Sequence, residues 1–169
     1  MYLTLWPLKK VVFFLSFLLV AFIAQAQEIK KWQITDVENY MKDTVSKVLV
    51  ISFWATFCKP CVAEIPSFIS ITDKYKSQKV ALLLVSLDLP SYYPKKIASF
   101  VKKQGYKANI VWLNETNADY FCPKIDKSWS GSIPGTLVVN TKTGYRKFFE
   151  EEMEAADFEN ELKLALASE

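Results

Sequence analysis

A short apolar run that ends just before two closely spaced cysteines restricts the fold of this chain more than any other feature. Val48–Phe53 is apolar except for Ser52, and its β-branched and aromatic side chains indicate a strand buried on both faces of a sheet. The sequence CKPC, residues 58–61, follows after a short connection, and a helix is predicted from there to about Lys76 with a kink at Pro66. The chain must therefore place a C-x-x-C motif where a central strand passes into a helix.

Strand and helix patterns alternate along the rest of the chain and end in a hairpin. Further strands are predicted at Ile29–Ile34, Lys79–Leu87, Asn109–Leu113, Thr136–Val139 and Tyr145–Phe149. Helices are predicted at Asp36–Lys42, around Ala118, at Pro94–Gln104 and at Ala155–Ala167. The acidic run Glu150–Glu152 is interpreted as the solvated start of the last helix. This order predicts an α/β fold with a central mixed sheet, helices on both faces and an antiparallel C-terminal hairpin.

Residues 1–26 have the pattern of a secretory signal peptide. Lys9 and Lys10 precede the apolar segment Val11–Ile23, and Ala24-Gln25-Ala26 places small residues where a signal peptidase recognises them. The apolar segment is shorter than the roughly 18 residues of a membrane-spanning helix, so an uncleaved anchor is the weaker alternative. We therefore expect cleavage after Ala26 and one exported, periplasmic domain from residue 27 to 169.

The composition removes several classes of function. The chain has no histidine, which excludes a Ser-His-Asp triad, a Cys-His protease dyad and an H-E-x-x-H zinc site. Its three cysteines are too few for a disulfide-dense scaffold. A net charge of +3 is too small to indicate nucleic-acid binding. Acid–base chemistry must therefore come from carboxylates, lysines, tyrosines or thiols.

The C-x-x-C motif carries the predicted chemistry. Unpaired N–H groups at a helix N-terminus stabilise a thiolate, so the pKa of Cys58 is expected to lie below that of a free thiol, and the charge of Lys59 acts in the same direction. Pro60 suits the first helical turn, and Cys61 would resolve a mixed disulfide formed by Cys58. The alternatives are a static disulfide or half of a zinc site. No metal is expected, because a zinc site needs two more ligands and the chain offers one further Cys and no His.

The segment from Phe53 to Pro66 resembles the active site of the thioredoxin superfamily, and it is most similar to the TlpA/ResA-like extracytoplasmic thiol-disulfide oxidoreductases. Ile133-Pro134-Gly135-Thr136 resembles the cis-proline loop of that family. The resemblance implies a thioredoxin-like fold with Cys58 as nucleophile and Cys61 as resolving thiol. It also implies a cis bond before Pro134, with the backbone of Ile133 free to pair with an extended substrate.

Two positions depart from the familiar pattern. Ser52 stands where cytoplasmic thioredoxins carry a buried aspartate, and a serine is no base at neutral pH. Glu64 matches a functional glutamate of ResA-like members and shares a helix face with Cys61, so a partly buried Glu64 would exchange the proton of the resolving thiol. Phe57 stands where many relatives carry tryptophan. Substrate contacts are expected from Trp54, Phe57, Lys59, Pro60 and Ile133.

The sequence therefore predicts a reductase of protein disulfides that needs no cofactor beyond the redox-active Cys58–Cys61 pair. The expected partners are substrate proteins with disulfides and an upstream membrane thiol reductant, and the chain is expected to be a monomer that binds no nucleic acid. One alternative is a thiol peroxidase of the related peroxiredoxin group, although the only arginine, Arg146, lies on the late hairpin. Another is a chaperone whose thiols hold a metal or a haem apoprotein.

Cys122 is left over from the pair. We interpret it as an inert, partly buried thiol, while intermolecular pairing and a third redox role stay open.

Overall fold

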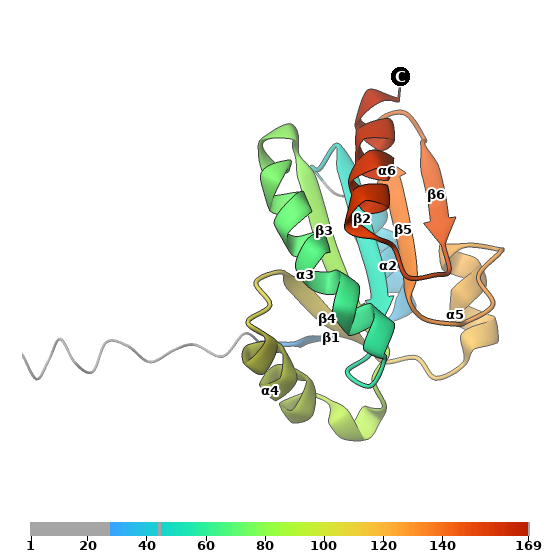
Figure 1. The fold of residues 1–169 in the computed structure, drawn as a ribbon. Helices are drawn as coiled ribbons and strands as arrows, with labels where there is room; N and C mark the ends of the chain where they lie inside the picture. Colours follow the sequence, from blue (N-terminus) through green and yellow to red (C-terminus); the bar gives the residue numbers. More distant parts are fainter. Residues whose placement is uncertain (1–27, 44, 169) are drawn as a thin grey trace, which may run out of the picture.

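A mixed β-sheet forms the centre of the fold (Figure 1). The computed structural model describes residues 28–43 and 45–168, so the predicted signal peptide and its cleavage point lie outside the described residues. Within these ranges one sheet has six strands in the order β1-β4-β3-β2-β5-β6. The strands are β1 (Lys30–Trp32), β2 (Val48–Trp54), β3 (Val80–Ser86), β4 (Asn109–Leu113), β5 (Gly135–Asn140) and β6 (Arg146–Phe149). Neighbours from β1 to β2 are parallel, whereas β5 is antiparallel to β2 and to β6, as the predicted C-terminal hairpin requires.

Helices cover both faces of the sheet. They are α2 (Ile34–Asp43), α3 (Lys59–Lys74), α4 (Lys95–Gln104), α5 (Ala118–Ile125) and α6 (Ala155–Ala167), with short 3-10 turns η1 (Lys76–Gln78) and η2 (Pro90–Tyr92). Side chains of β2 alternate between two cores: Val48 and Val50 pack with α3, α4 and α6, and Leu49 and Ile51 pack with α2 and α5. All seven residues of β2 are buried, which confirms the predicted central strand.

The predicted bounds of the first strand and the predicted start of the helix at Pro94 differ from the structure. The first strand is shorter than Ile29–Ile34, because α2 already begins at Ile34 and Asp36 accepts the Gln33 N–H at 2.8 Å from inside the first turn. Helix α4 begins at Lys95, after a cis Tyr93–Pro94 bond that the sequence did not indicate. The predicted helix stop at Gly105 is confirmed by its left-handed φ of 70°.

The prediction that Glu150–Glu152 start the last helix is wrong. Helix α6 begins only at Ala155, and Glu154 is its N-cap residue. Glu150 instead directs its carboxylate at the loop before β5, where Ser130 and Ser132 donate hydrogen bonds to it. The reason is tertiary, because the carboxylate of Glu150 is bound to a loop some twenty residues earlier in the chain.

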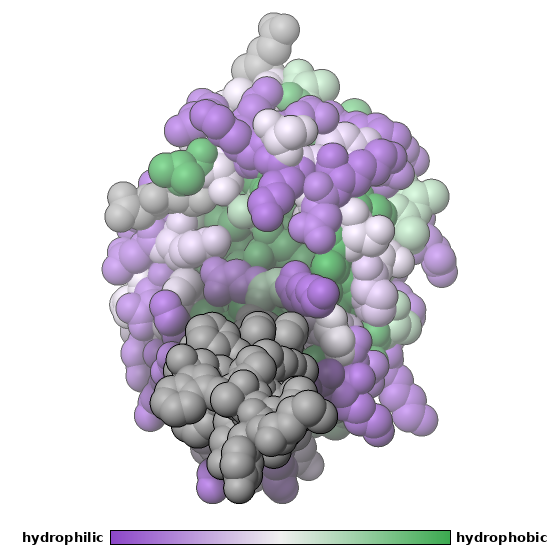
Figure 2. Space-filling model, turned by 90° about the vertical axis from the view of Figure 1, so that its left-hand side faces the viewer, coloured by the Kyte–Doolittle hydropathy of each residue, from purple (hydrophilic) through white to green (hydrophobic). Residues whose placement is uncertain are grey.

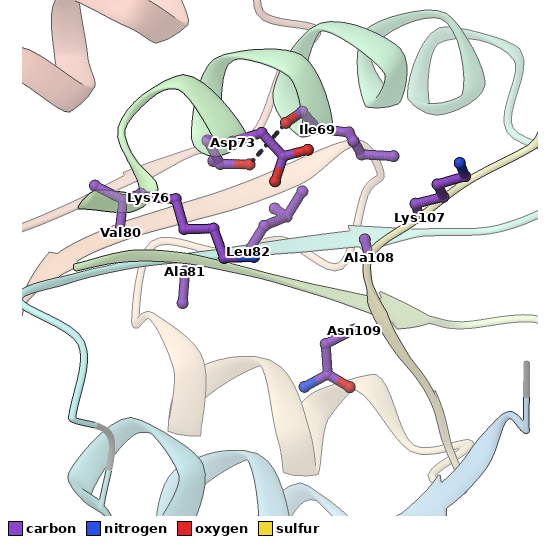
Figure 3. Close-up of a pocket in the computed structure, with 10 residues that line it drawn as sticks. Ile69, Asp73, Lys76, Val80, Ala81, Leu82, Lys107, Ala108 and Asn109 are labelled. Atoms are coloured by element: carbon purple, nitrogen blue, oxygen red, sulfur yellow. Dashed lines mark hydrogen bonds between the residues drawn. The ribbon is translucent and has the colours of Figure 1, made fainter. Parts of the chain in front are cut away.

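An open groove of about 480 Å³ lies between α3, the start of β3 and the segment before β4. The side of the molecule turned to the viewer in Figure 2 exposes apolar surface in a hollow that hydrophilic side chains surround. In Figure 3, Asp73 and Lys76 lie at the α3 side of the groove, and Lys107 and Asn109 lie on the opposite segment. The groove follows the C-terminal half of α3, whereas both cysteines of the C-x-x-C motif lie at the N-terminal end of that helix.

Candidate active site

The C-x-x-C motif lies where β2 passes into α3. A turn closed by the Cys58 N–H and the Ala55 carbonyl, 3.0 Å apart, leads out of the strand. Cys58 is the N-cap residue of α3, and Pro60 lies in the first turn, where its missing N–H costs no helix bond. Cys58 and Cys61 form a disulfide, and the Cys61 N–H points at Cys58 Sγ at 3.3 Å. The same N–H would stabilise a thiolate on Cys58 after reduction.

The two sulfurs differ in access from solvent. Cys58 is 8% exposed, whereas Cys61 is 0% exposed. An incoming thiol or disulfide can therefore reach Cys58 only. This asymmetry fits the expected division into an attacking and a resolving cysteine.

Glu64 lies one helical turn after Cys61 and is buried, with 2% of its surface exposed. Its Oε2 accepts the Met153 N–H at 2.9 Å, and its Oε1 has no hydrogen-bond partner among the described residues. Burial raises the pKa of the Glu64 carboxyl to about 7; the hydrogen bond from Met153 opposes this rise and the charge of Glu152 adds to it. The sequence left open whether Glu64 is buried; the structure encloses it, which is the condition under which a role in proton exchange was expected. A carboxyl with this pKa exchanges protons readily at neutral pH.

The pairing of β5 with β2 places the predicted cis-proline loop at the same end of the sheet as the cysteine turn. The Ile133–Pro134 bond is cis, as predicted. Gly135, the next residue, begins β5 and is paired with Phe53 near the end of β2, so Pro134 lies at the sheet end that leads into the cysteine turn. Pro134 is buried and Ile133 is half-buried. Figure 1 shows β5 running beside β2 in this way.

The residues predicted to contact substrate fall into two groups. Phe57 is 60% exposed, Lys59 is exposed, and Pro60 and Ile133 are half-buried, so all four keep surface that a substrate can reach. Trp54 does not, because it is 0% exposed and its ring packs 6.0 Å from Phe100 and 6.1 Å from Tyr106, centroid to centroid. The prediction that Trp54 contacts substrate is corrected: it is the last residue of a strand buried on both faces, and its side chain is part of the core between the sheet and helices α3 and α4.

Sequence reasoning missed a buried carboxylate beside the cysteine turn. Asp88 is 3% exposed and accepts hydrogen bonds from the Thr56 N–H at 3.1 Å, the Thr56 hydroxyl at 2.6 Å and the Ser86 hydroxyl at 2.8 Å. Leu89, the next residue, is 58% exposed. The sequence signal that could have identified Asp88 is its place just after a predicted strand. Because β3 and β2 are parallel, the residues that follow them lie at the same edge of the sheet.

The third cysteine lies apart from the pair. Cys122 is free, 3% exposed and part of α5, on the other face of the sheet from α3. Burial raises the pKa of its thiol to about 11, and the charges of Glu150 and Asp119 add to this effect. The expectation of a buried Cys122 is confirmed, and a thiol with so high a pKa is a poor nucleophile at neutral pH.

The part of the chain that the structure describes offers neither a preformed metal site nor a membrane-spanning helix. There, no group of three or more His, Cys, Asp or Glu side chains is arranged to hold a metal ion. Within the same residues, no helix combines the length and apolar character needed to cross a membrane.

Comparisons with known proteins place this geometry in context. Residues 19–144 match the AhpC/TSA family. The chain is 31% identical over 84 residues to the thiol-disulfide oxidoreductase ResA of Bacillus thuringiensis (strain Al Hakam), covering 48% of this chain and 47% of that protein. It is 26% identical over 100 residues to ResA of Halalkalibacterium halodurans, covering 59% and 52%. The aligned part thus spans about half the length of these curated relatives.

Solved structures share the fold. A thioredoxin-related protein from Neisseria meningitidis serogroup B superposes with a TM-score of 0.62 at 25% identity, covering 73% of this chain and 87% of the other. StoA from Bacillus subtilis superposes with a TM-score of 0.52 at 24% identity, covering 70% and 84%. The predicted thioredoxin-like fold is therefore confirmed.

Proposed function

The chain belongs to the AhpC/TSA family, and from that membership we propose that it is a thiol-disulfide oxidoreductase that works through Cys58 and Cys61. The observation that carries this proposal is the disulfide at the start of α3, in which Cys58 keeps a small exposed surface and Cys61 is fully enclosed. The ResA relatives, which carry that activity in their names, support it.

The first step is attack by the reduced enzyme on a substrate disulfide. The Cys58 thiolate, held by the Cys61 N–H, attacks one substrate sulfur and forms a mixed disulfide with it. The other substrate sulfur leaves as a thiolate and takes a proton from solvent. Phe57 and Ile133 offer apolar surface for the polypeptide on either side of the attacked bond.

The second step releases the product. The Cys61 thiol gives its proton to the Glu64 carboxylate, and the resulting thiolate attacks Cys58 Sγ. The substrate leaves with its second sulfur reduced, and Cys58 and Cys61 are left joined. Two electrons have then passed from the enzyme dithiol to the substrate disulfide. Glu64 is suited to this role by its place one turn from Cys61 and by its pKa near 7.

We further propose that the domain acts as a reductase in the periplasm, with its dithiol restored by an upstream membrane thiol reductant. The signal-peptide pattern of residues 1–26 supports the compartment. In an oxidising compartment a working reductase needs such a donor, because no bulk reductant would restore its thiols.

The test is to reduce insulin disulfides with the dithiol form and to measure the reduction potential of the pair. A reductase turns insulin over, and its Cys61→Ser variant accumulates covalent protein adducts on Cys58. A metal-holding chaperone would trap no adducts. A thiol peroxidase would instead consume hydrogen peroxide, and a potential near those of strong oxidants would contradict the reducing direction.

A further inference from the structure

The Glu150 carboxylate accepts several hydrogen bonds from the loop that precedes the cis-proline. The Ser130 N–H lies 3.0 Å from its Oε1, the Ser132 N–H lies 2.9 Å from the same oxygen, and the Ser130 hydroxyl donates to it as well. Backbone and side-chain donors that converge on one carboxylate form charge-assisted hydrogen bonds, which are stronger than neutral ones. The carboxylate therefore holds the backbone of residues 130–132 in one shape.

The rest of the loop is fixed from its other side. The Trp129 indole donates to the Ser132 carbonyl at 2.8 Å. Gly131 has a φ of +99°, and a Cβ at that position would lie 3.5 Å from Ala118 Cβ and 3.8 Å from Cys122 Sγ, so the loop lies directly on α5. Glu150 is thus the polar anchor of a loop whose inner side is already packed.

The anchored loop leads directly to the backbone that faces the active site. Ile133 follows Ser132, and Pro134 precedes Gly135, which is paired with Phe53 on β2. Glu150 itself follows Phe149, which is paired with Thr136 on β5. Three residues later the Met153 N–H reaches the Glu64 carboxylate. The segment after β6 therefore contacts both the loop before the cis-proline, through Glu150, and Glu64 on α3, through Met153.

We propose that Glu150 is a positioning residue for the substrate, because it presets the Ser130–Ser132 backbone so that Ile133 is offered to an extended polypeptide. The proposal rests on the proposed function, since it concerns the polypeptide that Cys58 attacks. Glu150 does not touch the reacting sulfurs. The reduction of a small disulfide, which makes no use of the Ile133 backbone, should therefore not depend on Glu150. When the Glu150 anchor is absent, binding of a polypeptide has to order the loop, and this weakens the binding.

The experiment compares Glu150→Gln with Glu151→Gln, which makes the same charge change on an exposed neighbour. Each variant is assayed on insulin and on hydroxyethyl disulfide. For Glu150→Gln we expect kcat/KM on insulin to fall about tenfold, mainly through KM, with the small-disulfide rate within about twofold of wild type. Ser130→Ala, which removes one donor, should give a smaller loss of the same kind. Glu151→Gln should match wild type on both substrates.

Equal losses on both substrates, or an unchanged KM for insulin, would overturn the proposal, because a general loss of fold or thiol chemistry affects both assays alike. Amide hydrogen exchange gives a second measurement that needs no activity. The Ser130 and Ser132 amides should exchange at least about tenfold faster in Glu150→Gln, and unchanged exchange also overturns the proposal. A wild-type protein that reduces neither disulfide contradicts the proposed function instead, and the exchange measurement still decides whether Glu150 anchors the loop.

Discussion

Asp88 holds Thr56 by both its N–H and its hydroxyl, at 3.1 and 2.6 Å. Thr56 lies inside the turn that the Cys58 N–H closes onto the Ala55 carbonyl, so the carboxylate that follows β3 fixes the turn that carries Cys58. The Trp112 indole in turn donates to the Asp88 carbonyl at 2.8 Å. The turn is therefore attached to two neighbouring strands of the sheet.

The variant Asp88→Asn tests this attachment. An amide replaces one acceptor with a donor that faces the Thr56 or Ser86 donors, so we expect the free energy of unfolding to fall by about 2 kcal/mol. Exchange with hydroxyethyl disulfide should slow about tenfold, because Cys58 is no longer held at the start of α3. Urea unfolding measures the free energy of unfolding, and the kinetics of thiol–disulfide exchange measure the rate. Asp73→Asn, an exposed change at the far end of α3, is the control, and equal behaviour of the two variants would contradict the assigned role.

Glu64 makes the stability depend on pH. Its folded pKa of about 7 lies above the ordinary 4.5, so the native state favours the protonated carboxyl; that contribution is complete below pH 4.5 and is lost as the pH rises through 7. Glu64→Gln should therefore gain stability relative to wild type as the pH rises over this window, by up to about 3 kcal/mol. Urea unfolding at a series of pH values checks the trend, and a stability difference that is constant with pH would contradict the raised pKa.

The same carboxyl should control the resolving step. In wild type, release of product from the mixed disulfide should slow as the pH falls below 7 and Glu64 becomes protonated. Glu64→Gln should release product at least about tenfold more slowly at pH 8 and lose this pH dependence. Rapid-mixing kinetics on a preformed Cys58 adduct measure the step directly. A variant that keeps the wild-type rate would remove Glu64 from the mechanism.

Phe68 and Phe158 fasten α3 to the C-terminal helix. Both are fully buried and their rings stack with centroids 4.1 Å apart. Phe158→Ala should lower the free energy of unfolding by about 3–5 kcal/mol, and Phe158→Leu by less, because the leucine fills part of the cavity. The contrast with an exposed change on the same helix, Leu164→Ala, separates packing from helix propensity, since Leu164 is 58% exposed. Similar losses for the two alanine variants would argue against the packed contact.

Cys122 should be dispensable for thiol chemistry. With its pKa raised to about 11 by burial, it should resist iodoacetamide at neutral pH in the native, reduced protein, while Cys58 reacts. Cys122→Ala should keep disulfide exchange within about twofold of wild type, because the C-x-x-C pair is complete without it. Mass spectrometry of the alkylated protein and insulin turnover check these outcomes. Substantial loss of turnover would restore a redox role for this thiol.

Sequence patterns predicted the helices and strands well where residues close in the chain determine the structure. The buried run of β2, the C-x-x-C junction and the left-handed stop at Gly105 all follow from residues close in sequence. The sequence could not decide what depends on distant partners. Glu150 resembles a helix start until Ser130 and Ser132 are seen to bind it, and the burial of Glu64 depends on the segment around Met153.

Trp54 and Asp88 show the same limit of sequence-based prediction, because Trp54 was wrongly assigned to the substrate surface and Asp88 was missed. An aromatic residue next to an active-site motif looks like a contact surface, yet the strand that carries Trp54 is enclosed by both cores. A carboxylate thirty residues after the turn looks unrelated to it until parallel pairing of β2 and β3 brings the two strand ends together.

The outer strands β1 and β6 both present cations. Lys30 and Lys31 are exposed on β1, and Arg146 and Lys147 are exposed on β6. Edge strands with such charges are poor templates for another strand, because the approaching chain would have to strip water from them. Both margins of the sheet are therefore protected against the addition of a strand from another chain, and under the proposed function a polypeptide substrate would have to form its backbone hydrogen bonds elsewhere, at the loop of Ile133.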